Sequence, residues 1–133
     1  MQSHGVKMTA EEFRQLALSF EGTIEGAHHG HPDFRVCGKI FATLGYPDTG
    51  WAMAKLTPSQ QHRFVGEHPD CFKPVNGGWG RRGATNVSLF TVTAPLARRA
   101  LALAHRNIKA AAPRTSPRQP AAEAARPLKR RAS

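Results

Sequence analysis

The chain has 133 residues, 40% of them hydrophobic, and carries a formal net charge of +10 at pH 7. This length predicts one domain with tails, and no apolar run is long enough to span a membrane or, near the start, to serve as a secretion signal. The two cysteines lack paired or metal-site spacing, which excludes a disulfide framework and predicts a cytoplasmic protein with free thiols.

The first predicted element is a helix that follows a short extension at residues 1–7. Thr9 begins the sequence TAEE, which has the spacing of a capping box. Apolar residues then recur at helical spacing from Phe13 to Phe20, and Gly22 is expected to end the helix.

Four strands are predicted next, over residues 23–29, 33–37, 40–44 and 51–56. Between the second and the third, Gly38 and Lys39 fit a two-residue type II′ turn, because glycine is favoured at the first position of that turn. The resulting register pairs Cys37 with Ile40 and predicts an antiparallel meander.

That register gives the predicted sheet two unlike faces. One face carries small residues on which a helix can lie closely; Arg35 is among them and could be a buried partner for Asp33 or Asp70. The other face is large and aromatic, and either it is covered by loops or a partner subunit or it is a recognition surface. Its members are Phe34, Val36, Phe41, Trp51 and Met53, with Lys55.

A second helix is predicted from an N-cap at Thr57 to about Gly66, since a proline at the first helical position and a glutamine at the third favour a helix start. Pro74 favours a short edge strand over residues 71–75, because proline cannot donate to a central ladder. A further strand is predicted over residues 85–91.

The last predicted helix is capped by Thr93 and runs to about Lys109 with one apolar face. The domain is therefore expected to span residues 8–110, and residues 111–133, which lack apolar periodicity, are expected to form a disordered basic tail. The element order α-β-β-β-β-α-β-β-α predicts an α+β domain, in which helices pack on one face of an antiparallel sheet of five to six strands.

Three stretches carry a family likeness: HPDFRVCGKIFATLG at residues 31–45, W at 51 with KL at 55–56, and CFKPVNGGWGRRGATNVSL at 71–89. Their combination and spacing resemble the MmcQ/YjbR family of small bacterial proteins. The resemblance covers roughly residues 8–109. It implies a CyaY-like fold and DNA binding through a proposed double-wing arrangement.

The stretch NGGWGRRGATNV, residues 76–87, is the main candidate for such a wing. Its glycines allow the backbone to approach a ligand closely, its arginines could bind phosphate, and Trp79 could stack on a base. Alternatively, Trp79 plugs the core beneath a tight turn and the arginines are solvated. We expect an extended wing in which Trp79 is the anchor and Arg81 or Arg82 makes the contact.

The distribution of charge favours a polyanionic partner, with nucleic acid first. Residues 1–109 hold 13 Lys and Arg against 8 Asp and Glu, and residues 110–133 hold 6 against 1, so each part carries +5. Solvated, scattered cations are the alternative interpretation. The candidate nucleic-acid-binding residues are Arg35, Lys39, Lys55, Lys73, Trp79, Arg81 and Arg82.

Neither a metal site nor catalysis is predicted. His28, His29 and His31 are close in sequence, but no cysteine or carboxylate accompanies them at zinc-site spacing. No P-loop, nucleophile-elbow or HExxH motif is present, and Cys37 is expected to face the core, where a thiol is inert. We therefore expect no metal, no cofactor and no enzymatic activity.

The sequence thus predicts a small, non-enzymatic protein that contacts the backbone of nucleic acid, with DNA favoured as the partner. It leaves the oligomeric state open and favours a monomer. A small-ligand or protein-interaction domain is the alternative, and it would use the aromatic sheet face and the Trp79 loop. An enzyme with an unrecognised site is the third hypothesis.

Overall fold

The computed structural model describes residues 7–28, 30–45 and 48–111. The predicted extension, apart from Lys7, and the predicted tail, apart from Ala111, lie outside these residues; Ala111 is helical, so the last helix runs two residues beyond its predicted end at about Lys109. In chain order the elements are α1 (Ala10–Leu18), β1 (Ile24–His28), β2 (His31–Val36), β3 (Lys39–Leu44), β4 (Trp51–Lys55), α2 (Pro58–Glu67), β5 (Phe72–Pro74), α3 (Gly78–Arg81), β6 (Ala84–Ser88) and α4 (Ala94–Ala111).

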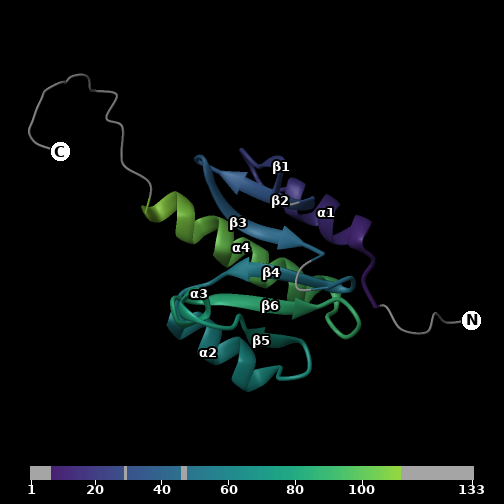
Figure 1. Ribbon diagram of the computed structural model, residues 1–133, viewed down its shortest axis with the longest axis vertical. Helices are drawn as coiled ribbons and strands as arrows, with labels where there is room; N and C mark the ends of the chain where they lie inside the picture. Colours follow the sequence, from purple (N-terminus) through teal and green to yellow (C-terminus); the bar gives the residue numbers. More distant parts are fainter. Residues whose placement is uncertain (1–6, 29, 46–47, 112–133) are drawn as a thin grey trace, which may run out of the picture.

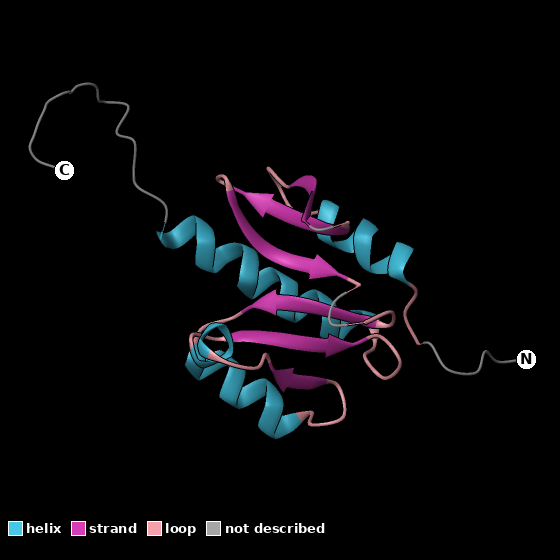
Figure 2. Ribbon diagram, viewed as in Figure 1, coloured by secondary structure: helices cyan, strands magenta, loops and turns pink. Residues whose placement is uncertain are grey.

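The six strands form one antiparallel sheet with the order β1-β2-β3-β4-β6-β5 (Figure 1). α4 crosses β2, β3 and β4, α1 contacts β3 and α4, and α2 packs on β5 and β6. The three long helices therefore lie on one face of the sheet (Figure 2). This confirms the predicted α+β architecture, with β5 at an edge. No helix in the described part of the chain is long and apolar enough to cross a membrane.

Both predicted capping boxes are present. The Thr9 hydroxyl accepts a hydrogen bond from the backbone N–H of Glu12 at 3.0 Å, and the Glu12 carboxylate accepts one from the backbone of Thr9 at 2.8 Å. Thr57 and Gln60 form the same exchange at the start of α2. These bonds satisfy amide groups that the first helical turn leaves unpaired, which explains why the two helix starts could be predicted.

Small residues at the centre of the sheet allow α4 to lie close to it. Ala42 pairs with Ala54 across β3 and β4, and both are fully buried beneath the helix layer. α4 itself presents small residues such as Ala100 and Ala104 to this surface. Large apolar side chains from α1 and β2, including the ring of Phe13, fill the space around them.

The β2–β3 hairpin differs from its predicted register. The turn consists of Cys37 and Gly38, with φ of 54° and 77°, as in a type I′ turn, whose twist suits a hairpin. Val36 therefore pairs with Lys39, and Arg35 with Ile40. The prediction placed this turn one residue too late.

Phe41 is an extra residue in β3, because Arg35 pairs with Ile40 while Phe34 pairs with Ala42. Such a bulge bends its strand and re-aims a side chain. Phe41 is fully buried, and its ring meets that of His105 on α4 edge to face at 5.3 Å. The predicted aromatic second face is therefore wrong, since Phe34, Val36 and Phe41 all belong to the core.

Replacing Cys37 with asparagine is expected to raise the free energy of unfolding by about 0.5 kcal/mol, because asparagine tolerates a positive φ better than cysteine does. Urea denaturation monitored by circular dichroism measures the change. Cys71→Ser, a variant of the other thiol, is the control for loss of a thiol. An unchanged or lower midpoint for Cys37→Asn would contradict the turn geometry.

Candidate nucleic-acid interface

The glycine-rich stretch is a helical turn and not the extended wing that was predicted. In α3, the amides of Arg81 and Arg82 donate to the carbonyls of Gly77 and Gly78, each at 3.1 Å. The Arg82 amide also donates to the carbonyl of Trp79 at 3.1 Å. The periodicity of apolar residues could not reveal this turn, because it is only four residues long.

Two of the glycines are required by close packing. A Cβ on Gly80 would lie 2.6 Å from the carbonyl carbon of Val75 and closer still to its oxygen. A Cβ on Gly83, whose φ is +113°, would meet the carbonyl of Leu56 in the same way. The side chain of Gln61 on α2 completes the attachment by donating to the carbonyls of Gly80 and Ala84, each at 2.9 Å.

Trp79 does not anchor this turn in the core. Trp79 is 36% exposed, and the buried residue of α3 is Gly80. Trp79 and Arg82 are three residues apart on the turn, so their side chains project from the same side of it. The anchoring role predicted for the tryptophan is carried by backbone contacts and by Gln61.

Arg81 and Arg82 bring two positive charges together. A Cβ on Gly78 would lie 3.6 Å from Nη1 of Arg82 and 3.7 Å from Nη2 of Arg81, so both guanidinium groups reach over the same glycine. Within the described residues, neither arginine has a carboxylate within 4.0 Å. Their charges therefore remain available to a ligand.

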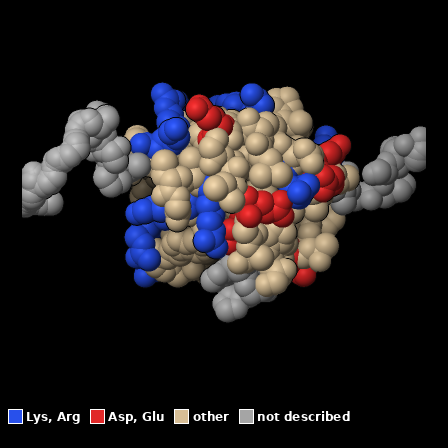
Figure 3. Space-filling view, turned by 90° about the horizontal axis from the view of Figure 1, so that it is seen from above, with Lys and Arg blue, Asp and Glu red and all other residues tan. Residues whose placement is uncertain are grey.

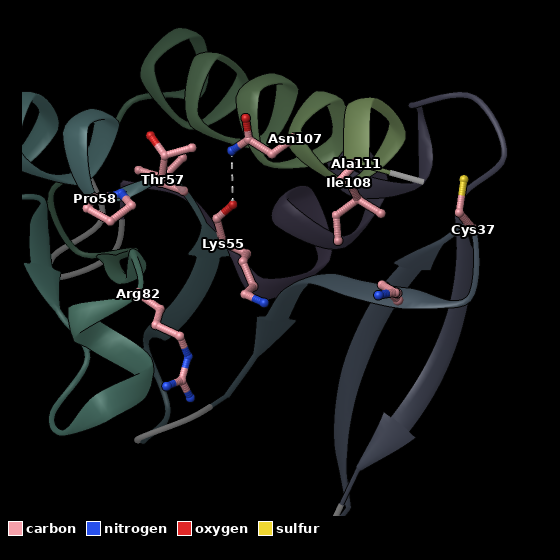
Figure 4. Close-up of a pocket in the computed structure, with 10 residues that line it drawn as sticks. Cys37, Lys55, Thr57, Pro58, Arg82, Asn107, Ile108 and Ala111 are labelled. Atoms are coloured by element: carbon pink, nitrogen blue, oxygen red, sulfur yellow. Dashed lines mark hydrogen bonds between the residues drawn. The ribbon is translucent and has the colours of Figure 1, made fainter. Parts of the chain in front are cut away.

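Arg82 also lines a cavity of about 290 Å³ that we call the basic cleft. Lys39 from the start of β3 and Lys55 from the end of β4 line it as well, and no carboxylate is among its lining residues in the described chain. Figure 4 shows the side chains of Lys55 and Arg82 below α4, whose last turns carry Asn107, Ile108 and Ala111. Three cations from separate segments thus converge on one hollow.

The basic cleft lies where β3 and β4 are no longer paired with each other. The ladder between these strands ends at the pair Ala42–Ala54, while β3 begins three residues earlier, at Lys39. The extra residue at Phe41 lies in this unpaired part, where a bulge bends the strand away from its neighbour. The space left between the two strand ends is closed from behind by α4.

The floor of the basic cleft is apolar and its walls are fixed. Leu56, Ile108 and Ala111 line it, and Leu56 and Ile108 are buried. Asn107 joins the walls: its Nδ2 donates to the carbonyl of Lys55 at 3.3 Å and to Oε1 of Gln60 at 2.8 Å. The end of β4, the start of α2 and the end of α4 are thereby held together.

The sequence model of the YjbR family matches residues 18–107, which include all of the basic cleft except Ala111 and Ile108. The chain belongs to the YjbR family. The described fold also resembles the crystal structure of the Deinococcus radiodurans protein DR2400, a DUF419 domain, with a TM-score of 0.63 and 16% identity, over 77% of this chain and 80% of that one. No curated protein sequence matches the chain.

The remaining predicted cations of this YjbR domain lie outside the basic cleft. Lys73 pairs with Asn86 on the sheet face opposite the helices and does not line the cavity. Arg35 forms a bidentate ion pair with Asp33, at 2.9 and 3.1 Å, so the partner agrees with one predicted alternative. The Arg35 side chain is not buried as that alternative expected, because it is 41% exposed on the helix-free face. The hydrogen bond and charge of Asp33 raise the pKa of Arg35 above its ordinary value.

Replacing Arg35 with glutamine is expected to destabilise the YjbR domain at pH 7, because the fully buried Asp33 carboxylate would lose its partner. Thermal unfolding at pH 7 measures the loss. Arg35→Gln combined with Asp33→Asn is the control, because it removes the buried charge as well, and it should be less destabilised than the single variant. An equal or greater loss in the double variant would contradict the expectation.

Cys37 is exposed and lines the basic cleft, so the prediction that it faces the core was wrong. The reason is that the hairpin turn lies one residue earlier than predicted and includes Cys37. His29 and the side chain of His28 lie outside the described residues, whereas His31 is half-buried on β2. No three metal-ligating side chains gather within the described ranges.

The charged side chains are unevenly placed on this YjbR domain. Figure 3 shows Lys and Arg gathered at its left end, and Asp and Glu mostly towards its centre and right. Several acidic side chains are already paired: Arg14 binds Glu11 at 3.0 Å and Glu25 at 2.7 Å. Among the described residues, no carboxylate lies within 4.0 Å of Lys39, Lys55 or Arg82, so no ion pair neutralises the cations of the basic cleft.

Proposed function

We propose that this YjbR domain binds the phosphate backbone of nucleic acid, with DNA as the favoured partner, through the basic cleft and the adjoining α3 turn. The observation that carries the proposal is the convergence of Lys39, Lys55 and Arg82, without a neutralising carboxylate, on one cavity. Arg81 extends this surface along α3. Phosphate contacts made by such side chains are strong and largely independent of sequence.

We also propose that the role is binding without catalysis. None of the described residues that line the basic cleft is a histidine or a carboxylate, the side chains that most often act as general bases. Two of the polar side chains that do line it are held in place by hydrogen bonds, Thr57 at the start of α2 and Asn107 on α4. These features support a rigid anion-binding surface.

The test must separate the folded domain from the basic segment that follows it, because the six Lys and Arg of residues 112–133 could bind DNA alone. We would replace these six side chains with glutamine in the full-length protein. The affinity of this tail-neutral variant for a duplex of about 20 base pairs would be measured by fluorescence anisotropy from 50 to 200 mM salt.

The tail-neutral variant is expected to keep DNA binding, with a logarithmic salt dependence of about −4, since roughly one counterion is released for each of four phosphate contacts, those of Lys39, Lys55, Arg81 and Arg82. If the unaltered protein binds DNA and the tail-neutral variant does not, the affinity resides in residues 112–133. That outcome would overturn the proposal that the basic cleft is the interface.

A further inference from the structure

We infer that the basic cleft holds a single nucleoside monophosphate unit, with the phosphate on its cationic rim and the base on its apolar floor. This inference rests on the proposed function and deepens it, because it changes the ligand from a continuous backbone to one unpaired nucleotide. The unit could be the end of a strand or a free nucleotide, since both present the same chemistry.

The size of the cavity favours a small unit. Its volume of about 290 Å³ lies at the lower limit of pockets that enclose small molecules, which run from roughly 300 to 1,000 Å³. A double helix is convex and too wide to enter such a space, so duplex DNA could touch only the rim. One extruded or terminal nucleotide could enter it.

The basic cleft is lined by cationic and by aliphatic side chains, and a nucleotide has a phosphate for the first and a base for the second. The rim carries the ammonium groups of Lys39 and Lys55 and the guanidinium of Arg82, which suit a phosphate. The floor is formed by aliphatic side chains, among them Leu56, Ile108 and Ala111. Inorganic phosphate would leave this floor in contact with water, whereas a planar base would cover it.

Trp79 supplies a place for a second base. It projects from the same side of α3 as Arg82, and it is 36% exposed. Exposed aromatic side chains beside a cationic groove are the platforms on which successive bases of single strands stack. A strand end that places its last nucleotide in the basic cleft could therefore stack its next base on Trp79.

The first experiment measures binding to the full-length protein by calorimetry, with deoxyadenosine monophosphate, inorganic phosphate and deoxyadenosine as separate probes. We expect the nucleotide to bind about tenfold or more tightly than either fragment, because each half of the ligand adds its own contact. Equal affinity for inorganic phosphate and for the nucleotide would show that the floor does not hold a base, and would overturn the inference.

The second experiment blocks the cavity without changing its charge. Ala111 is exposed and lines the basic cleft, whereas the neighbouring Ala110 is exposed and does not line it. Ala111→Trp is therefore expected to abolish nucleotide binding, and Ala110→Trp is the matched control and should retain it. Thermal unfolding of both variants confirms that they are folded. Retained binding by Ala111→Trp would contradict occupancy of the cavity.

The third experiment distinguishes the two sources of the nucleotide and separates this inference from the proposed function. A blunt DNA hairpin is compared with the same hairpin carrying one unpaired 5′-phosphorylated nucleotide, and tighter binding of the second supports a strand end. Nucleotide binding without any DNA binding would support a free nucleotide and overturn the proposed function. DNA binding that is equal for both hairpins and indifferent to Ala111→Trp would overturn the inference alone.

Discussion

Gly80→Ala is expected to lower the free energy of unfolding by about 3 kcal/mol. The new Cβ would overlap the carbonyl group of Val75, and a backbone group cannot rotate away as a flexible side chain can. The α3 turn would have to move, and the hydrogen bonds from Gln61 would be lost with it. Urea denaturation followed by tryptophan fluorescence measures the change.

Gly66→Ala is the matched control, because Gly66 lies within α2 and an added Cβ there meets no atom within 4 Å. Alanine is the better helix former by about 0.5–1 kcal/mol, so this variant should be more stable than the unaltered protein. The two substitutions therefore have opposite expected signs. Equal midpoints for them would contradict the close packing of Gly80.

The double substitution Arg81→Gln, Arg82→Gln is expected to weaken DNA binding by up to roughly 100-fold at low salt, since each charge-assisted contact contributes on the order of 1.5 kcal/mol. The slope of affinity against salt should fall by about 2, because two phosphate contacts are lost. Fluorescence anisotropy on the tail-neutral background measures both quantities. Glutamine keeps most of the length of each side chain.

Arg98→Gln, Arg99→Gln is the control, because it removes two adjacent exposed arginines from the other end of α4, about 15 Å along the helix from Ile108. These arginines lie over the rings of Phe20 and Phe64, so a small loss of stability is expected. DNA affinity should change little. Equal losses of affinity in the two double variants would mean that net charge, and not the α3 turn, governs binding.

The elements that could be predicted from the sequence are those marked by residues within or directly beside them. Thr9 and Thr57 mark helix starts because a capping box lies within four residues, and Pro74 marks an edge because it lacks a donor. The position of the hairpin turn was missed because Cys37 adopts a positive φ that cysteine rarely takes. This shift, together with the bulge at Phe41, moved aromatic residues from the predicted exposed face into the core.

The candidate site was predicted in its composition but not in its shape. Lys39, Lys55 and Arg82 were among the candidates, and the structure places them around one cavity. Their convergence depends on the end of a strand ladder and on α4, features that join residues more than fifty positions apart. The role of Gln61 was also missed, because a side chain that bonds distant carbonyls leaves no signal in local sequence.

The separation of charge also acts before any contact is made. Within the described residues, Lys and Arg gather at one end and carboxylates lie mostly elsewhere, so this part of the chain has an electric dipole that a polyanion would align during approach. The basic cleft would then already face the partner when the two molecules collide, and a larger fraction of the collisions would lead to binding.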